Sequence, residues 1–261
     1  MPAARVVFWA ATLAGIAFAA RAVLAEPPSL AVSAAAALGY LGLVLAGVFS
    51  LRLQMFADVL VRGPAGARGV ALTFDDGPHP EHTRAVLEVL ERRGAKATFF
   101  VIGKKAEAHP DLVREIVRRG HEVGVHGYVH DRLFALRGPR RVRADLLRAI
   151  EALERITGTR PDLFRPPIGH TNPTIARMAE RLDLTVVGWS ASGRDGVRAR
   201  AEDVVRRVRR GLEDGAIVLL HDAAERDDRT PAALEALPRI LDALDEKNLR
   251  VAPLRPWVDP L

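Results

Sequence analysis

VALTFDDGP, residues 70–78, decides the fold of this chain, because a short apolar run ends there in two adjacent carboxylates and a Gly-Pro pair. The run from Val70 to Phe74 predicts a buried β-strand. Apolar residues then recur at helical spacing up to Gly94, which predicts an amphipathic helix, and the run from Ala97 to Ile102 predicts the next strand. The alternation continues along the chain. It predicts further strands near residues 122–125, 162–164, 185–188, 216–220 and 250–252, with helices between them.

Strands that alternate with amphipathic helices are typical of parallel strands joined by helical crossovers. About seven such units over about 200 residues favour one α/β domain with a barrel-like sheet, and an open doubly wound sheet is the alternative. In both architectures the loops after the carboxyl ends of the strands carry the chemistry. We therefore expect the functional residues directly after strands.

The first 52 residues differ from the rest of the chain. Residues 29–51 contain no charged side chain, and a helix needs about 20 apolar residues to cross a bilayer, so this run predicts a transmembrane helix. The run at residues 6–25 is alanine-rich and includes Arg21. It is either a second span or a signal-like segment with a cleavage site before Glu26. We divide the chain into a membrane anchor of one or two spans at residues 1–52, a linker at residues 53–67 and a body at residues 68–261.

The number of spans decides on which side of the membrane the body lies. A single span with its N-terminus in the cytoplasm exports the body, and this extracytoplasmic location is the one we expect. A hairpin of two spans instead places Arg5, Arg52, Arg62 and Arg68 on one side and Arg21 on the other. The positive-inside rule assigns the arginine-rich side to the cytoplasm. Both arrangements agree with the sequence.

Composition excludes several functional classes. The chain contains no cysteine, which excludes disulfides, iron–sulfur clusters and thiolate zinc sites. A net charge of +6 and a pI of about 10.4 favour anionic partners, but no interleaving of aromatic and basic residues supports nucleic-acid binding. Part of the excess lies in the arginine pairs 206–207 and 209–210, which indicate a solvated helix face. We expect membrane lipid as a partner, and no nucleic acid.

Two strand ends carry candidate metal ligands. Asp75 and Asp76 are like charges, which disfavour joint ionisation unless a cation or another partner separates their roles. The structural alternative is a helix-capping aspartate beside a solvated one. His126 and His130 follow the third strand, and their i, i+4 spacing brings two imidazoles to one side of a helical turn, as in zinc-binding helices. With one aspartate they predict a metal site that leaves positions open for water.

Two further strand ends carry other candidate catalytic groups. RPPIG, residues 165–169, follows a fourth strand, and because proline has no N–H, the first free backbone donor after Arg165 belongs to Ile168. LLHD, residues 219–222, ends a later strand and places His221 where a general acid is needed. Four motifs at four strand ends indicate a catalytic site.

The chain resembles the polysaccharide deacetylases of carbohydrate esterase family four, relatives of the nodulation chitooligosaccharide deacetylases. The resemblance is carried by four motifs in this order: TFDDGP, H-x-x-x-H, RPPxG and L-x-H. The resemblance covers residues 68 to 255 approximately. It implies a distorted (β/α) barrel and the metal-dependent removal of N-acetyl groups from amino sugars.

The resemblance also implies which residues bind the metal and activate water. Asp75 is the base, and Asp76, His126 and His130 bind a divalent ion. Zinc is the ion we expect, with cobalt, nickel or manganese as alternatives.

The remaining roles are implied in the same way. Arg165 orients the base, Asp195 supports Arg165, and Leu219 lines the acetyl pocket. His221 is the acid, and the backbone N–H of Ile168 helps the metal to hold the oxyanion.

Three positions depart from the family pattern. Gly127 stands where the family usually has Ser or Thr, Ile168 where it has Tyr, and Gly196 where it has an aromatic residue. The metal and acid–base residues are intact, so we expect a deacetylase that acts on N-acetylamino sugars in a cell-envelope polysaccharide or oligosaccharide. The alternatives are an O-acetyl esterase or deformylase on a lipid-linked sugar, and a membrane-tethered glycan-binding protein with an inactive site.

Overall fold

The structure is a computed structural model that describes residues 1–25 and 27–258. Two predicted features, the cleavage site and the end of the body, involve residues outside the described part. Glu26, beside the predicted cleavage site, and residues 259–261, at the end of the predicted body, lie outside the described part.

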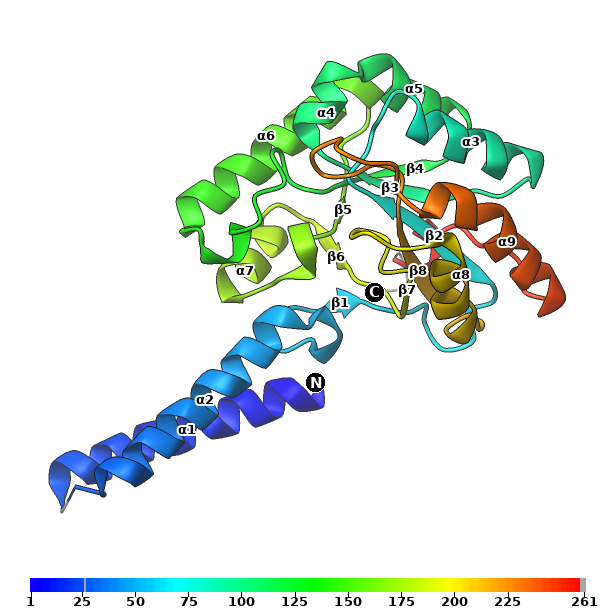
Figure 1. Ribbon diagram of the computed structural model, residues 1–261. Helices are drawn as coiled ribbons and strands as arrows, with labels where there is room; N and C mark the ends of the chain where they lie inside the picture. The colour runs from blue at the N-terminus through cyan, green and yellow to red at the C-terminus, as the bar shows by residue number, and fades with distance from the viewer. Residues whose placement is uncertain (26, 259–261) are drawn as a thin grey trace.

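One parallel sheet forms the centre of the body (Figure 1). The strand order is β1-β6-β5-β4-β3-β2-β8-β7, and every neighbouring pair is parallel. Strands β2 to β6 follow one another across the sheet without the reversal that defines a doubly wound fold. The predicted α/β architecture with a curled, barrel-like sheet is confirmed. The strands are β1 (Val59–Leu60), β2 (Val70–Asp75), β3 (Thr98–Val101), β4 (Glu122–Val125), β5 (Leu163–Phe164), β6 (Thr185–Val187), β7 (Ala191–Ser192) and β8 (Ala216–His221).

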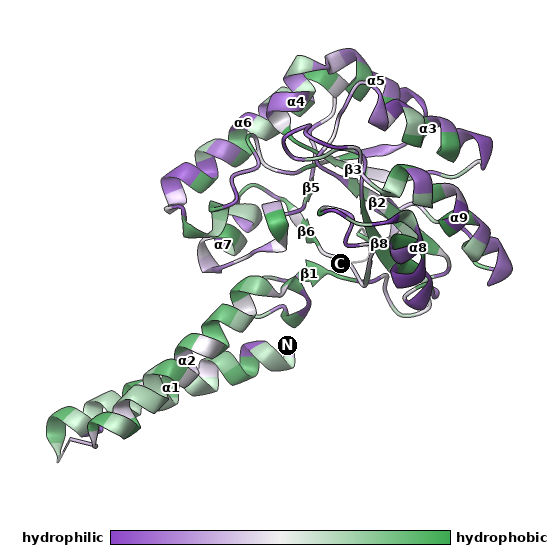
Figure 2. Ribbon diagram, in the orientation of Figure 1, coloured by the Kyte–Doolittle hydropathy of each residue, from purple (hydrophilic) through white to green (hydrophobic). Residues whose placement is uncertain are grey.

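Amphipathic helices cover the outside of the curled sheet (Figure 1). Each buries one apolar stripe and leaves its charged side chains in solvent, as in the hydropathy colouring of Figure 2. The helices of the body are α3 (His82–Arg92), α4 (Gly103–Ala108), α5 (Pro110–Arg118), α6 (Pro139–Thr157), α7 (Pro173–Arg181), α8 (Ala201–Arg210) and α9 (Ala233–Glu246).

Strand β2 shows how the sheet positions the site. Successive side chains of a strand point to opposite faces. Val70, Leu72 and Phe74 therefore pack in the main core cluster. Thr73 and Asp75 lie on the other face of the strand, inside the curl, and both are buried.

The sheet differs from its prediction at both edges. The described residues form eight strands, because the sequence analysis missed β1 and β7, which have two residues each. Residues 250–252 form a single bridge, Val70 to Val251, and no strand. Strand β1 lies within residues 53–67, which were predicted to be a linker. Leu51 and Met55 are also buried, so the segment after the apolar helices packs against the body.

The two apolar helices α1 (Ala3–Leu24) and α2 (Leu30–Phe49) form a hairpin that projects from the body (Figures 1 and 2). Both are long and apolar enough to cross a membrane, and almost none of their residues is buried. Thr12 Oγ1 lies 2.9 Å from the hydroxyl of Tyr40 and joins the two helices. Arg5 forms an ion pair of 2.9 Å with Asp58, so the start of α1 lies beside the body. Each helix is a candidate span, and both meet the body at the same end of the hairpin.

Candidate active site

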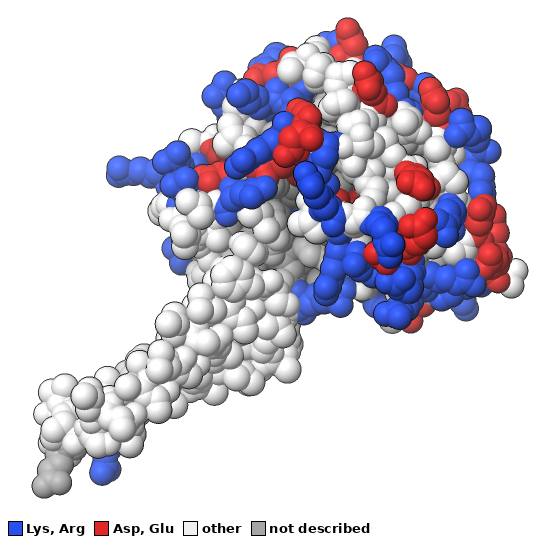
Figure 3. Space-filling model, in the orientation of Figure 1, with Lys and Arg blue, Asp and Glu red and all other residues white. Residues whose placement is uncertain are grey.

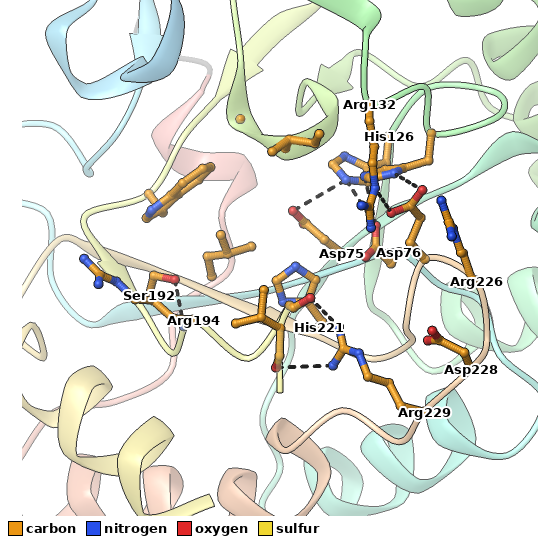
Figure 4. A pocket seen from close by; sticks show the side chains of 18 residues that line it. Asp75, Asp76, His126, Arg132, Ser192, Arg194, His221, Arg226, Asp228 and Arg229 are labelled. Atoms are coloured by element: carbon orange, nitrogen blue, oxygen red, sulfur yellow. Dashed lines mark hydrogen bonds and ion pairs between the residues drawn. The ribbon is translucent and has the colours of Figure 1, made fainter. Parts of the chain in front are cut away.

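Seven of the nine predicted site residues line one cavity at the carboxyl ends of β2, β4, β5 and β8, and the other two, Arg165 and Asp195, are buried behind it. The cavity has a volume of about 570 Å³. Figure 4 shows that Asp75, Asp76, His126 and His221 converge there from different elements. They do so because the ends of parallel strands meet at the same edge of the sheet.

Three of these residues present ligand atoms to a common point. Asp76 Oδ1 lies 3.4 Å from His126 Nε2 and 3.3 Å from His130 Nε2, and the ligand atoms of the three residues lie within 4.8 Å of one another. All three side chains are buried. Asp76 and His130 have φ angles of +74° and +50°, a left-handed conformation that Asp and His adopt more readily than most residues.

Groups behind the two histidines orient their rings: a hydrogen bond in the case of His126, and a nearby carboxylate in the case of His130. His126 Nδ1 lies 2.8 Å from the carbonyl oxygen of Arg165. Since a carbonyl accepts, Nδ1 carries the hydrogen, and the lone pair of Nε2 faces Asp76. His130 Nδ1 lies 3.5 Å from Glu225 Oε1, and Glu225 is in turn paired with Arg132 at 2.6 Å.

This arrangement fits a divalent cation. Within the described residues, the buried Asp76 Oδ1 has no hydrogen-bond partner, which is costly unless another group satisfies it. Although burial favours the neutral imidazole, the carboxylates of Asp75 and Asp76 raise the pKa of His126, so positive charge is stabilised here. Two imidazole nitrogens and one carboxylate oxygen are ligands that zinc uses in catalytic sites.

Asp75, the neighbour of Asp76 in sequence, is bound by a buried arginine. Arg165 has no exposed surface, and its Nη1 donates to Asp75 Oδ1 at 2.7 Å and to Thr73 Oγ1 at 2.8 Å. Its other nitrogens donate to the carbonyl oxygens of Val187 and Gly188 at 3.2 and 2.9 Å. The expected contact between Arg165 and Asp75 is therefore present, and the two adjacent aspartates have different partners.

Among the described residues, no hydrogen bond or ion pair joins Asp195 to Arg165, although the resemblance implies that Asp195 supports Arg165. Its carboxylate accepts from the backbone N–H of His221 at 2.8 Å, and its second oxygen lies 3.1 Å from His221 Nδ1. Burial favours the neutral ring, but attraction to Asp195 and the hydrogen bond that the ring donates to its carboxylate, with smaller effects of Asp76 and Asp75, raise the pKa of His221 to about 9. Arg165 already donates to Asp75, Thr73 and two backbone carbonyls. Asp195 instead accepts from His221.

The substrate wall contains the two other predicted residues. Leu219 lines the cavity from β8. Ile168 lies in a 3₁₀ turn, Pro167–Gly169, with 46% of its surface exposed and a φ of +59°. This conformation is strained for a β-branched residue and costs about 1–3 kcal/mol. Within the described part of the chain, the Ile168 N–H donates to no backbone carbonyl.

Two of the departures from the family pattern have local explanations. Gly127 has a φ of +75°, a conformation that favours glycine. A Cβ atom at Gly196 would lie 2.7 Å from Cε1 of His221, so the histidine ring occupies the space of a side chain at this position.

Sequence reasoning missed several residues around the cavity. Glu225 and Arg132 support His130, and Arg229 donates to the carbonyl oxygens of Asp195 and Gly196. They lie in loops with no periodic pattern, so only the folded chain brings them to the site. Trp189 packs against the core and also lines the cavity.

Comparison with known proteins places this site in a family. The sequence model of the polysaccharide deacetylase family matches residues 62–187. A peptidoglycan-N-acetylglucosamine deacetylase of Bacillus cereus is 35% identical over 190 residues, which cover 72% of this chain and 86% of the relative. The chitooligosaccharide deacetylase of Sinorhizobium fredii is 35% identical over 202 residues, 74% of this chain and 93% of the relative.

A solved structure agrees with these relatives. The family 4 carbohydrate esterase from Streptomyces lividans in complex with acetate has a TM-score of 0.65 and 34% sequence identity, and the match covers 72% of this chain and 94% of the esterase. With the fold, the site and the sequence in agreement, the chain belongs to the polysaccharide deacetylase family.

Proposed function

We propose that this protein is a metal-dependent deacetylase that removes N-acetyl groups from N-acetylamino sugars of a cell-envelope polysaccharide or oligosaccharide. The observation that carries the proposal is that residues of one cavity have different partners. Asp76, His126 and His130 form a metal-type triad, while Asp75 and His221 are each held by a separate charged partner.

Asp76, His126 and His130 would hold the cation. A bound divalent cation polarises the amide carbonyl and lowers the pKa of a water molecule to about 7. Zinc is the ion that best suits two histidines and one carboxylate.

Asp75 and Arg165 act on the attacking water. Asp75 accepts a proton from the water, and Arg165 fixes the carboxylate through a contact of 2.7 Å. Burial of this pair keeps bulk water from competing for the carboxylate, because both side chains are almost inaccessible.

His221 and Ile168 act on the substrate. His221, whose protonated form is stabilised by Asp195, donates a proton to the departing amine. The Ile168 N–H donates to the oxygen that develops negative charge, and Leu219 contacts the acetyl methyl group. Acetate and a free amino sugar are the products.

Acetate release from N-acetylglucosamine oligomers tests the proposal. We expect activity in the purified full-length protein, loss of activity after chelation, and recovery on addition of zinc. The N-formyl and O-acetyl forms of the same oligomer should react more slowly. Faster hydrolysis of either form would assign a deformylase or an esterase, and binding of the oligomer without any metal-dependent hydrolysis would assign an inactive glycan-binding protein.

A further inference from the structure

A second cavity adjoins the active-site cavity. It has a volume of about 720 Å³ and extends to residues 49–52, directly after the end of α2. We call it the basic groove. The residues that line both cavities form a shared wall, and they are Ile168, Gly169, Trp189, Ser192 and Arg194.

The basic groove carries concentrated positive charge. Four arginines line it, and no Asp or Glu is among its described lining residues. The four are Arg52, Arg194, Arg207 and Arg210. None of them forms an ion pair with a carboxylate of the described chain, whereas the neighbouring Arg206 and Arg209 pair with Asp203 at 2.6 Å and Glu246 at 2.7 Å.

The contacts that these arginines do make are with backbone carbonyls. Arg52 donates to the carbonyl oxygens of Trp189 and Ser190, and Arg207 donates to that of Gly193 at 3.1 Å. These bonds orient two guanidinium groups without neutralising them. Like charges held together are stabilised by an anion, and guanidinium groups match the geometry of phosphate oxygens.

The position of the groove indicates where the anion comes from. The loop that carries Ile168 is joined to the end of α2, because the Thr171 N–H donates to the Val48 carbonyl at 3.1 Å and the rings of Phe49 and His170 lie 4.7 Å apart. When α2 crosses a bilayer, Arg52 lies at the membrane surface. Figure 3 shows Lys and Arg side chains gathered where the largely uncharged hairpin meets the body.

The active-site cavity lies on one side of the shared wall, and the basic groove lies on the other. In Figure 4, Arg194 and Ser192 lie on one side of the active-site cavity, away from Asp76 and His126. A ligand with an anionic group in the groove can therefore extend a sugar toward the triad.

We propose that the basic groove binds the phosphate or diphosphate that joins a sugar to a lipid, so that the enzyme deacetylates a membrane-embedded glycosyl phospholipid. This inference rests on the proposed deacetylase function and names its substrate class. A soluble sugar phosphate offers the same charge, but the contact between the groove and the end of α2 favours the lipid as its source.

The experiment compares three substrates on full-length protein in nanodiscs of neutral phospholipid. They carry the same N-acetylglucosamine unit, attached to a lipid diphosphate, to a soluble diphosphate or to a neutral oligosaccharide. We expect kcat/KM to be highest for the lipid diphosphate. The double variant Arg207→Gln/Arg210→Gln should lower kcat/KM for the lipid diphosphate about tenfold or more, mainly through KM, because it removes charge-assisted hydrogen bonds to the anion.

The matched control is the double variant Arg206→Gln/Arg209→Gln, which removes two charges from the same helix outside the groove. It should leave all three substrates unchanged, and Arg207→Gln/Arg210→Gln should leave the neutral oligosaccharide unchanged. Equal losses on lipid diphosphate and neutral oligosaccharide would overturn the proposal, and equal rates on lipid and soluble diphosphate would overturn the lipid assignment.

A binding measurement separates this proposal from the deacetylase function. Retention of the lipid diphosphate by nanodisc-embedded protein is measured against retention of an ordinary anionic phospholipid, without turnover. Selective, arginine-dependent retention supports the groove even when no substrate releases acetate, whereas equal retention of the two lipids contradicts it and indicates only surface attraction.

Discussion

Asp75→Asn is the substitution that tests the site most directly. The change keeps the shape of the side chain and removes its charge. In the structure, Asp75 Oδ1 accepts from Arg165 at 2.7 Å, while Oδ2 lies 3.8 Å from His126 Nε2. A neutral amide in this place cannot take a proton from water, so turnover should fall while the triad stays in position.

The magnitude follows from two contributions. A general base contributes about 10²- to 10⁴-fold to the rate, which corresponds to about 2.7–5.4 kcal/mol at about 1.36 kcal/mol for each factor of ten. Leaving one buried charge without its partner costs about 3–5 kcal/mol of folding free energy. We expect the loss of folding free energy to lie at the lower end of this range, because Arg165 keeps its bonds to Thr73, Val187 and Gly188.

The assay combines acetate release, metal content and thermal unfolding on the same preparations. Asp76→Asn is the matched control, because it makes the same chemical change one residue further along the chain. We expect Asp75→Asn to retain metal without turnover and Asp76→Asn to lose metal. Full activity in Asp75→Asn would refute the base assignment, and equal metal loss in both variants would refute the separation of roles.

Three further predictions concern the acid, the substrate wall and the anchor. Because His221 has a pKa raised to about 9, its protonated form stabilises the fold below its ordinary pKa of 6.5, and this stabilisation is lost as the pH rises through 9. Asp195→Asn should therefore shift the alkaline limb of kcat/KM to lower pH, and an unchanged limb in the pH–rate profile would contradict the contact. Ile168→Ala should change the preference among acetylated glycans and keep kcat within about tenfold, because the proposed hydrogen-bond donor is the backbone N–H. Kinetics on a panel of glycans check this. A loss of kcat as large as that of a metal-ligand variant would argue against the backbone role. The full-length chain should remain in membranes after carbonate treatment, and release without detergent would show that the apolar helices do not span.

The sequence predicted the strands that carry the chemistry because those strands are long enough to show a pattern. β2, β4 and β8 are four to six residues long, are mostly apolar and lead into polar motifs, and their bounds agree with the prediction within about one residue. β1 and β7 have two residues each, too few for any periodicity to appear. Their place in the sheet is decided by the neighbouring strands.

The partners of the site residues could be predicted only in part. Arg165 contacts Asp75, as the resemblance implies, whereas Asp195 contacts His221. No local pattern in the sequence tells which buried cation a distant carboxylate faces. The arginines of α8 show the same limit. Arg206 and Arg209 form ion pairs as a solvated helix face would, while Arg207 and Arg210, one position further along the helix, line the basic groove.

The loop from Arg165 to Thr171 connects anchoring with catalysis. Its first residue holds the base, its 3₁₀ turn presents the Ile168 N–H, and its last residues bind the end of α2. Because Ile168 is held in a strained conformation, the contacts on both sides of it must maintain the turn. One of these contacts is provided by the membrane-candidate helix itself, through Val48 and Phe49. The hairpin therefore supports the loop that carries Ile168. In the membrane-bound enzyme that we propose, a lipid-linked substrate meets the groove before it meets the triad.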